Sequence, residues 1–313
     1  MFAACDDPSA VVEERDYAVK SKGGECPPWE CGYNSAEVNG RAIRELNLDG
    51  EANADGVRIV GFSAPAGILG DYALTVEDDE LVARAGEKAL RGAALVGATI
   101  VVSSPGLLKL PVPITIAGYA EQTAWADGAA KVPSYALVYP DVDALLGLRD
   151  VCNGELLGPL TGTAVVLGGE TYDLASKTVN PDQDRWLTIA CAGSAAAKLR
   201  LMNYGPQSDF DGEGHPATPA QRQATLKMLT ADYCGDGTSY TANGTPLAWE
   251  NAEGTVQTST KQGALEGVWG PAGALCLEAT RLADVEVACE LPSCASLGLD
   301  PLAKGEWITH LPQ

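Results

Sequence analysis

Histidine is scarce in this sequence: among 313 residues there are only two, His215 and His310. Neither lies in a recognisable catalytic motif, and no Cys-x-x-Cys pair occurs. A nucleophilic serine or cysteine needs a positioned base, and structural zinc sites draw on paired cysteines and histidines. The sequence therefore gives little support to either chemistry.

Long apolar runs and phenylalanines are also missing. No stretch of about 18 consecutive apolar residues occurs, which is the length that a transmembrane helix requires. Only three phenylalanines stand against 35 glycines and 19 prolines, which favours short strands and turns over long helices. An apolar content of 46% is enough for a packed core.

Basic residues are few. Lysine and arginine number 21 against 42 aspartates and glutamates, which gives a formal net charge of −21. Such a surface repels nucleic-acid phosphates and anionic lipid headgroups, so we expect no nucleic-acid partner. The acidic side chains serve solubility or, at a few loops, cation binding.

The first residues resemble the end of a bacterial lipoprotein signal, because Phe2, Ala3 and Ala4 precede Cys5, the residue that would carry the lipid. The charged and apolar regions that normally come earlier in such a signal are missing, so a chance match is the alternative. On the lipoprotein interpretation, residues 1–32 form an N-terminal tether. We expect contact with a membrane only through that lipid.

The nine cysteines favour an oxidising compartment. Without Cys5 they form an even set of eight, enough for four disulfides. Two pairs close short local loops, which favours pairing within each: Cys26 with Cys31, and Cys289 with Cys294. A cytosolic protein with nine free thiols is the alternative. The predicted disulfide cysteines are Cys26, Cys31, Cys152, Cys191, Cys234, Cys276, Cys289 and Cys294.

Residues 33–150 are predicted to form a β-rich domain. Short runs rich in valine, isoleucine, threonine and tyrosine, several of them alternating with polar residues, occur at 56–64, 72–85, 94–104, 113–126 and 134–140. This spacing suits a small sandwich or barrel. Glycines and a lack of strand patterning at 143–159 favour a boundary there, with a second domain at 151–313.

The second half mixes strands with two helices. Residues 185–205 are typical of a strand that runs into an alanine-rich helix, with a glycine as the last residue. The clearest helix is predicted at 218–235, where Thr218 and Gln221 form a capping box and Gly235 marks the end.

Three motifs carry a family resemblance. The stretch "TADYCGDGTSYTANGTPLAWEN" (230–251) is preceded by "RWLTIACAGSAAAKLRLMNYGP" and followed by "EGVWGPAGALCLEATRL". The combination of ADYCGDG, NGTP and WGPxGAxC resembles the ADYC domain, a bacterial domain named for Ala231, Asp232, Tyr233 and Cys234. The resemblance covers about residues 150–295 and implies an exported bacterial protein, without implying any activity.

The resemblance also bears on the disulfides. Relatives often carry cysteines at the positions of Leu199 and Thr225, and both are absent here, as a missing disulfide would leave them. An antiparallel packing of the two helices is in keeping with this, because it sets 199 opposite 225 and 191 opposite 234. The expected pairs are Cys191–Cys234 and, by elimination, Cys152–Cys276.

Two chemical alternatives stay open. Cys191 precedes the first predicted helix, whose N-terminus lowers the pKa of a thiol, so a thiol-dependent hydrolase acting through Cys191 or Cys234 is one alternative. The other is calcium binding by Glu51, Asn53 and Asp55, which alternate before a glycine like the start of an oxygen-rich loop. The stretch "DFDGEG" (209–214) is a weaker candidate of the same kind.

The sequence therefore predicts an α+β protein, with a β-rich N-terminal sandwich or barrel followed by a disulfide-stapled α+β domain that contains a helical pair. The leading function is non-enzymatic binding or scaffolding at the bacterial cell surface or in the periplasm, as a lipoprotein or secreted protein. No cofactor is expected, except for Ca²⁺ at the loop just described. The partner is an unknown extracytoplasmic ligand or protein. The alternative is an extracytoplasmic hydrolase, either thiol-dependent or built on a carboxylate pair that the sequence does not reveal.

Overall fold

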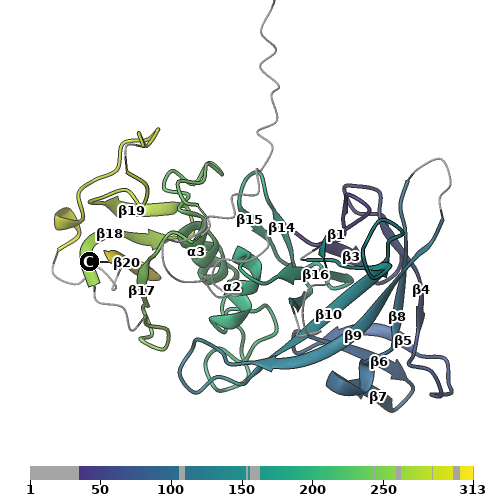
Figure 1. The fold of residues 1–313 in the computed structure, drawn as a ribbon. Helices are drawn as coiled ribbons and strands as arrows, with labels where there is room; N and C mark the ends of the chain where they lie inside the picture. Colours follow the sequence, from purple (N-terminus) through teal and green to yellow (C-terminus); the bar gives the residue numbers. More distant parts are fainter. Residues whose placement is uncertain are drawn as a thin grey trace, which may run out of the picture.

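The computed structural model describes residues 35–105, 110–152, 154–155, 163–242, 244–258, 262–283, 285–298 and 304–312 (Figure 1). Three expectations lie outside these residues: the tether at 1–32, lipidation of Cys5 and pairing of Cys26 with Cys31. The fold class is confirmed as α+β, because many antiparallel strands accompany two α-helices in the described chain.

A nine-stranded antiparallel sheet dominates the N-terminal half and lies at the right of Figure 1. Its outermost strands, β3 and β4, contact each other, so the sheet is nearly closed into a barrel. The main path runs through β3 (Glu45–Asn47), β16 (Trp186–Cys191), β13 (Ala164–Gly168), β10 (Val132–Pro140), β9 (Val112–Gln122), β8 (Thr99–Ser103) and β4 (Arg58–Ser63). Off this path, β11 (Leu148–Asp150) pairs with β10, and β12 (Gly154–Glu155) pairs with β11.

The barrel core follows from residue alternation. Ile100 and Val102 on β8, and Ile114 and Ile116 on β9, are buried at every second position, while the residues between them are more exposed. A strand turns successive side chains to opposite faces, so alternation buries one face of the sheet. Each such aliphatic side chain contributes about 1.5–3 kcal/mol when fully buried.

Strands β13 and β16 form a wall shared by two hydrophobic cores. One face packs into the barrel core and the other into a second core built around the helices, so both strands are apolar at nearly every position. The barrel face carries Ala164, Val166, Leu187, Ile189 and Cys191. The opposite face carries Val165, Leu167 and Ala190. One continuous sheet therefore contains strands from both sides of residue 150.

Smaller elements cover the barrel. A three-stranded sheet of β5 (Ala73–Glu77), β6 (Glu80–Ala85) and β7 (Lys88–Arg91) continues into the 3₁₀-helix η1 (Gly92–Leu95). Its β6 strand contacts β13, and the Leu81 N–H donates to the Tyr135 hydroxyl at 3.1 Å. Two short ribbons complete this half: β1 (Glu37–Val38) with β2 (Arg41–Ala42), and β14 (Thr171–Asp173) with β15 (Thr178–Asn180).

The two helices begin where their caps predict. α2 (Ala195–Leu201) starts after Ser194, whose hydroxyl accepts from the Ala197 N–H. α3 (Pro219–Thr230) starts at the capping box of Thr218 and Gln221, which is confirmed. Such caps satisfy helix N–H groups that have no partner inside the helix, and each is worth about 1 kcal/mol.

The predicted helix ends at Gly205 and Gly235 are wrong. α2 ends at Leu201 and is followed by Asn203 with φ of 67°. α3 ends at Thr230, where Ala231 takes the left-handed conformation with φ of 49°. Asparagine tolerates positive φ, whereas an alanine there has to be held by tertiary contacts, which are described below.

A four-stranded antiparallel sheet follows the helices, in the order β17 (Ala248–Asn251), β20 (Trp307–Pro312), β18 (Gln262–Gly270) and β19 (Gly273–Leu277). Figure 1 shows both helices between this sheet and the barrel. α2 contacts β13 and β16, α3 contacts β18, β19 and β20, and the helices contact each other. The 3₁₀-helix η2 (Cys294–Leu297) packs on β19. Neither described helix combines the length and apolar character needed to cross a membrane.

Two tryptophans anchor the second core. Trp269 and Trp307 are fully buried, and each indole N–H donates at 2.8 Å to a threonine hydroxyl, Thr309 and Thr225 respectively. A buried indole needs such a partner. These two side chains are therefore core residues and do not line a ligand groove.

Candidate functional site

The six cysteines in the described part of the chain form three disulfides. Bonds join Cys152 to Cys191, Cys234 to Cys289 and Cys276 to Cys294. The expected pairs Cys191–Cys234, Cys152–Cys276 and Cys289–Cys294 are therefore wrong. Cys191 is the last residue of β16 and faces the barrel core together with Cys152, so it lies on the far side of the sheet from the helices.

These bonds remove both candidate nucleophiles. Cys191 is fully buried, and neither it nor Cys234 carries a free thiol in the structure. A thiolate is the nucleophilic form of cysteine, and a disulfide sulfur provides none. Three disulfides in one chain indicate an oxidising, extracytoplasmic environment.

The two histidines lie in different settings. His215 is exposed on the loop before α3, whereas His310 lies on β20, paired with Ala248 and Leu265. Burial lowers the pKa of His310, and its Nδ1 is buried without a hydrogen-bond partner. The neutral imidazole is therefore the form that the fold favours.

This burial predicts a pH dependence of stability. The pKa of His310 in the folded state lies below its ordinary value of 6.5. Between these two pKa values, His310 is therefore more protonated in the unfolded chain than in the folded chain. The free energy of unfolding should fall as pH drops from about 7.5 through 6.5 towards the folded-state pKa. Urea denaturation at pH 7.5 and pH 6 (about one unit above and half a unit below the unfolded pKa) measures this. His310→Gln should flatten the difference, and an unchanged difference in that variant would contradict the assignment.

The predicted calcium ligands Glu51, Asn53 and Asp55 lie in the loop between β3 and β4. Asn53 is already bonded to the protein's own backbone: its Oδ1 accepts from two N–H groups at 2.9 and 3.0 Å, and its Nδ2 donates to two carbonyls. Asp55 Oδ2 accepts from the Ala42 N–H at 3.0 Å. These bonds give Asn53 and Asp55 a role in loop structure, and calcium binding there stays a prediction.

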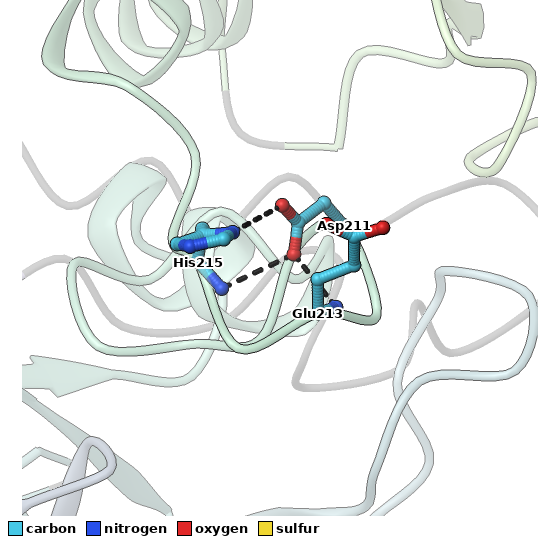
Figure 2. A group of neighbouring side chains, drawn as sticks. All are labelled: Asp211, Glu213 and His215. Atoms are coloured by element: carbon cyan, nitrogen blue, oxygen red, sulfur yellow. Dashed lines mark hydrogen bonds and ion pairs between the residues drawn. The ribbon is translucent and has the colours of Figure 1, made fainter.

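A second group of metal-ligating side chains lies on the loop before α3. Asp211, Glu213 and His215 each bring a ligand atom within 4.8 Å of the others, and all three are exposed. Figure 2 shows the Asp211 carboxylate turned towards the His215 ring, to which it is bonded at 2.7 Å. Its other oxygen accepts from the N–H groups of Glu213 and His215.

The hydrogen bonds of Asp211 stabilise a turn of the chain, and this turn accounts for the closeness of Asp211, Glu213 and His215. Bonds from the two backbone N–H groups and from His215 lower the pKa of Asp211 to about 2, so its carboxylate is charged at all ordinary pH values. A mixed set of carboxylates and one imidazole suits zinc better than calcium. A metal ion would have to replace the Asp211–His215 hydrogen bond in an exposed position. The loop is therefore a weak candidate for metal binding.

The loop between β10 and β11 exposes a cluster of large apolar side chains. Val142, Leu145 and Leu146 have exposed fractions of 98%, 83% and 67%. The loop is nonetheless well structured, because Asp141 accepts from the Asp143 N–H and pairs with Arg149. Exposed apolar groups that gather in one place mark contact surfaces in soluble proteins.

The segment 231–234 lies at the end of α3, in the second core. Asp232 is fully buried, and its Oδ2 accepts from the Lys227 ammonium at 2.6 Å and from the Gly237 N–H at 2.9 Å. Lys227 also donates to the carbonyls of Ser176 and Gly235, at 2.8 and 3.2 Å. The two charges therefore compensate each other inside the protein, while the second carboxylate oxygen of Asp232, Oδ1, is buried without a hydrogen-bond partner.

Tyr233 connects the helix end to the C-terminal sheet. Its hydroxyl donates to Glu266 and accepts from the Arg281 N–H, at 2.7 and 2.8 Å, and its ring stacks on Trp269. Burial raises the pKa of Tyr233 far above its ordinary value, so the phenol stays neutral. Arg281 donates to both Glu266 oxygens and to the Met228 and Leu229 carbonyls at the end of α3. These bonds hold the left-handed turn at Ala231.

Two glycines allow the segment to pack against the β18–β19 turn. A Cβ on Gly235 would lie 2.0 Å from the Ala272 carbonyl oxygen, and one on Gly273 would lie 2.6 Å from the Tyr233 carbonyl oxygen. Both residues also have positive φ, at 73° and 115°. The Ala274 N–H donates to the same Tyr233 carbonyl at 2.9 Å. The ADYCG residues (231–235) and the PAGA residues (271–274) therefore pack against each other.

Comparison with protein families decides the relationship. The family model described as the ADYC domain matches residues 92–283. The chain belongs to the ADYC domain family. No curated protein and no solved structure matches it.

The match begins earlier than the expected residue 150. It starts at η1 and includes β8, β9 and β10, which belong to the same sheet as β13 and β16. The ADYC domain therefore includes much of the barrel wall as well as the helical pair and part of the C-terminal sheet.

Within this ADYC domain, the four residues of the name have structural roles. Ala231 ends the helix, Asp232 neutralises a buried lysine, Tyr233 joins the Glu266–Arg281 ion pair and Cys234 forms a disulfide. None of the four presents an unpaired nucleophile, base or acid to solvent.

A carboxylate pair also exists, but in the interior. Asp79 and Glu170 are both fully buried. Burial raises the pKa of each, because the charged carboxylate loses its contact with water. Their partners are Arg200, whose Nε lies 3.8 Å from Asp79, and Arg222, which pairs with Glu170 at 2.5 Å. A substrate could not reach either carboxylate without displacing core residues, so this pair is structural.

A surface hollow of about 290 Å³ lies between the first turns of α3 and the C-terminal sheet. Its lining is mostly apolar, with three polar side chains: Gln221, Lys304 and Glu306. The Glu306 carboxylate accepts from the Tyr204 hydroxyl, which in turn accepts from Asn251 Nδ2 at 3.0 Å. Burial raises the pKa of Glu306, and the hydrogen bonds from Tyr204 and Gln221 oppose that rise.

Sequence reasoning missed Glu306 and the residues around it. Tyr204, Asn251 and Glu306 belong to three separate segments of the chain. Glu306 also precedes a strand, β20, that was not predicted. No local spacing links Glu306 to Tyr204, 102 residues earlier. Only the folded arrangement brings them together.

Proposed function

We propose that this ADYC-domain protein is a non-enzymatic binding or scaffolding protein of the bacterial cell surface or periplasm. The observation that carries the proposal is the internal use of the segment 231–234: Asp232 pairs with Lys227, the Tyr233 hydroxyl bonds to Glu266, and Cys234 is held in a disulfide. A catalytic signature would keep at least one such group available to a substrate.

Two further features support a binding role. The apolar loop with Val142, Leu145 and Leu146 offers a contact surface, and the hollow at Glu306 offers space for a small ligand. The partner is an extracytoplasmic ligand or protein. Lipidation at Cys5 would hold the protein at a membrane, and release without lipid would leave it secreted.

Production in two compartments tests the proposal. Full-length protein made in an oxidising compartment should be folded, resistant to protease and unreactive towards iodoacetamide at the six cysteines of the three disulfides. The same chain made in a reducing cytoplasm should unfold at a lower temperature, because disulfides restrict the unfolded chain. Rapid alkylation of Cys191 or Cys234 in the oxidised protein, with hydrolysis of a thioester or ester that alkylation abolishes, would contradict the proposal and favour a thiol hydrolase.

A further inference from the structure

The fully buried carboxylates share one property. Asp79, Glu170, Asp232 and Glu266 each have an exposed fraction of 0%, and each pairs with a cationic side chain of the same chain. The partners are Arg200, Arg222, Lys227 and Arg281 respectively. Burying a carboxylate is expensive unless its charge is compensated, and this chain provides that compensation in all four cases.

Glu306 lacks such a partner. It is half-buried, and its hydrogen-bond donors within the described residues are neutral: the Tyr204 hydroxyl and the Gln221 amide. No arginine or lysine of the described chain lies within ion-pair distance of it, and Lys304, on the same hollow, donates instead to the Leu297 carbonyl at 2.6 Å. Glu306 therefore lines the hollow with a half-buried carboxylate that has no cationic partner among the described residues.

The hollow combines apolar walls with a few polar side chains. Apolar groups of Ala220, Ala224, Pro271 and Leu275 surround the polar side chains. Small-molecule sites combine mostly apolar walls with a few placed polar groups, and volumes of about 300 Å³ are typical of the smallest. A net charge of −21 also draws cations towards the protein and repels anions.

We propose that this hollow binds a small organic ammonium ion, whose charge pairs with Glu306 and whose apolar part lies against Ala224, Pro271 and Leu275. This deepens the binding role proposed above and rests on it. A metal ion fits less well, because a single carboxylate among apolar groups offers too few oxygen ligands. The Tyr204 hydroxyl and Gln221 amide position the carboxylate, and the ligand supplies the missing cation.

Protonation should compete with this binding. Burial raises the pKa of Glu306, and no cationic side chain among the described residues offsets the loss of solvent. A bound ammonium ion favours the charged carboxylate, so affinity should fall as pH drops through the pKa of Glu306. The affinity of a neutral ligand does not require the ionised carboxylate, so it should change much less with pH.

A titration with n-butylammonium chloride tests the proposal on the oxidised full chain, followed by amide chemical shifts in ¹⁵N NMR. We expect saturable shifts at Gln221, Gly270 and Gly305, with a dissociation constant on the order of 1 mM for a ligand of five heavy atoms. Glu306→Gln keeps an acceptor for Tyr204 and removes only the charge. It should weaken binding at least about tenfold, which corresponds to one lost charge-assisted hydrogen bond.

Two controls make the result specific. Neutral n-butanol should bind at least about tenfold more weakly than n-butylammonium, and Glu253→Gln, which removes an exposed charge near Glu306, should change affinity less than about twofold. The melting temperature of Glu306→Gln should equal or exceed that of the wild type, because an uncompensated buried charge is removed.

The proposal is overturned if Glu306→Gln binds n-butylammonium as tightly as the wild type, if n-butanol binds equally well, or if no saturable shift occurs in the hollow. Mass analysis of the same sample distinguishes these outcomes from failure of the proposed function. Intact disulfides with no binding refute the ligand class alone, whereas free thiols at Cys191 or Cys234 refute the extracytoplasmic binding role.

Discussion

Arg281→Met is expected to lower the free energy of unfolding by about 3–5 kcal/mol. The Arg281 guanidinium is 2% exposed and donates at 3.0 and 3.2 Å to the two oxygens of Glu266, which is fully buried. It also donates to two of the last carbonyls of α3, at Met228 and Leu229, where the regular hydrogen-bond pattern of the helix ends. Methionine fills similar space but leaves the Glu266 charge buried without compensation. Urea denaturation followed by circular dichroism measures the change.

A surface ion pair provides the matched control. Arg185 pairs with Asp49 at 2.7 Å, but the two side chains are 51% and 56% exposed. Arg185→Met should cost less than about 1 kcal/mol, because water screens such a pair. If Arg281→Met costs no more than Arg185→Met, the Glu266–Arg281–Tyr233 network does not stabilise the end of α3 as argued.

Loss of the Cys234–Cys289 disulfide should cost about 4 kcal/mol in the chain-entropy estimate. The bond joins residues separated by 55 positions, so its removal greatly enlarges the unfolded ensemble. Cys234→Ser combined with Cys289→Ser tests this by urea denaturation. Cys276→Ser with Cys294→Ser, across 18 positions, should cost less, about 3 kcal/mol.

The single variants separate a staple from a nucleophile. Cys234→Ser and Cys289→Ser remove the same bond, so a structural role predicts similar losses of stability from each. A catalytic role for Cys234 predicts instead that Cys234→Ser alone abolishes an activity that Cys289→Ser leaves intact. That second pattern would contradict the structural account of the ADYC segment.

Local sequence signals predicted local structure well. The capping box at Thr218 and Gln221 is present because it depends only on residues three apart. The strands at 113–126 and 134–140 correspond to β9 and β10, because their β-branched residues alternate or form buried runs. The helix ends failed because tertiary contacts decide them. Arg281 binds the last carbonyls of α3, and Ala231 then adopts a conformation that propensity alone disfavours.

The disulfide partners failed for a topological reason. Cys191 was expected to face α3, but the β13–β16 register places it on the barrel side of the shared wall. A shift of one position along a strand turns a side chain to the opposite face. Cys289 and Cys294 are close in sequence, yet they bond to the end of α3 and to β19 respectively. Pairing of this kind depends on tertiary structure that spacing does not encode.

The Glu306 site could not have been predicted from the sequence. Glu306 differs from the four fully buried carboxylates, which all have cationic partners. Those partners lie between 5 positions away in the sequence, as for Asp232 and Lys227, and 121 positions away, as for Asp79 and Arg200. Its hydrogen-bond donors come from α3 and from the residue that follows α2 by three positions. The motifs predicted membership of the ADYC family, but they did not predict the structural roles of the motif residues.

Non-reducing peptide mapping by mass spectrometry tests the central claim most directly, namely that Cys234 is half of a structural disulfide. Trypsin leaves Cys289 and Cys294 on one peptide between Arg281 and Lys304, so a second cut after Glu290 is needed to separate them. The account predicts linked peptides for Cys152–Cys191, Cys234–Cys289 and Cys276–Cys294. A free, rapidly alkylated Cys234 in protein purified from its oxidising compartment would contradict it.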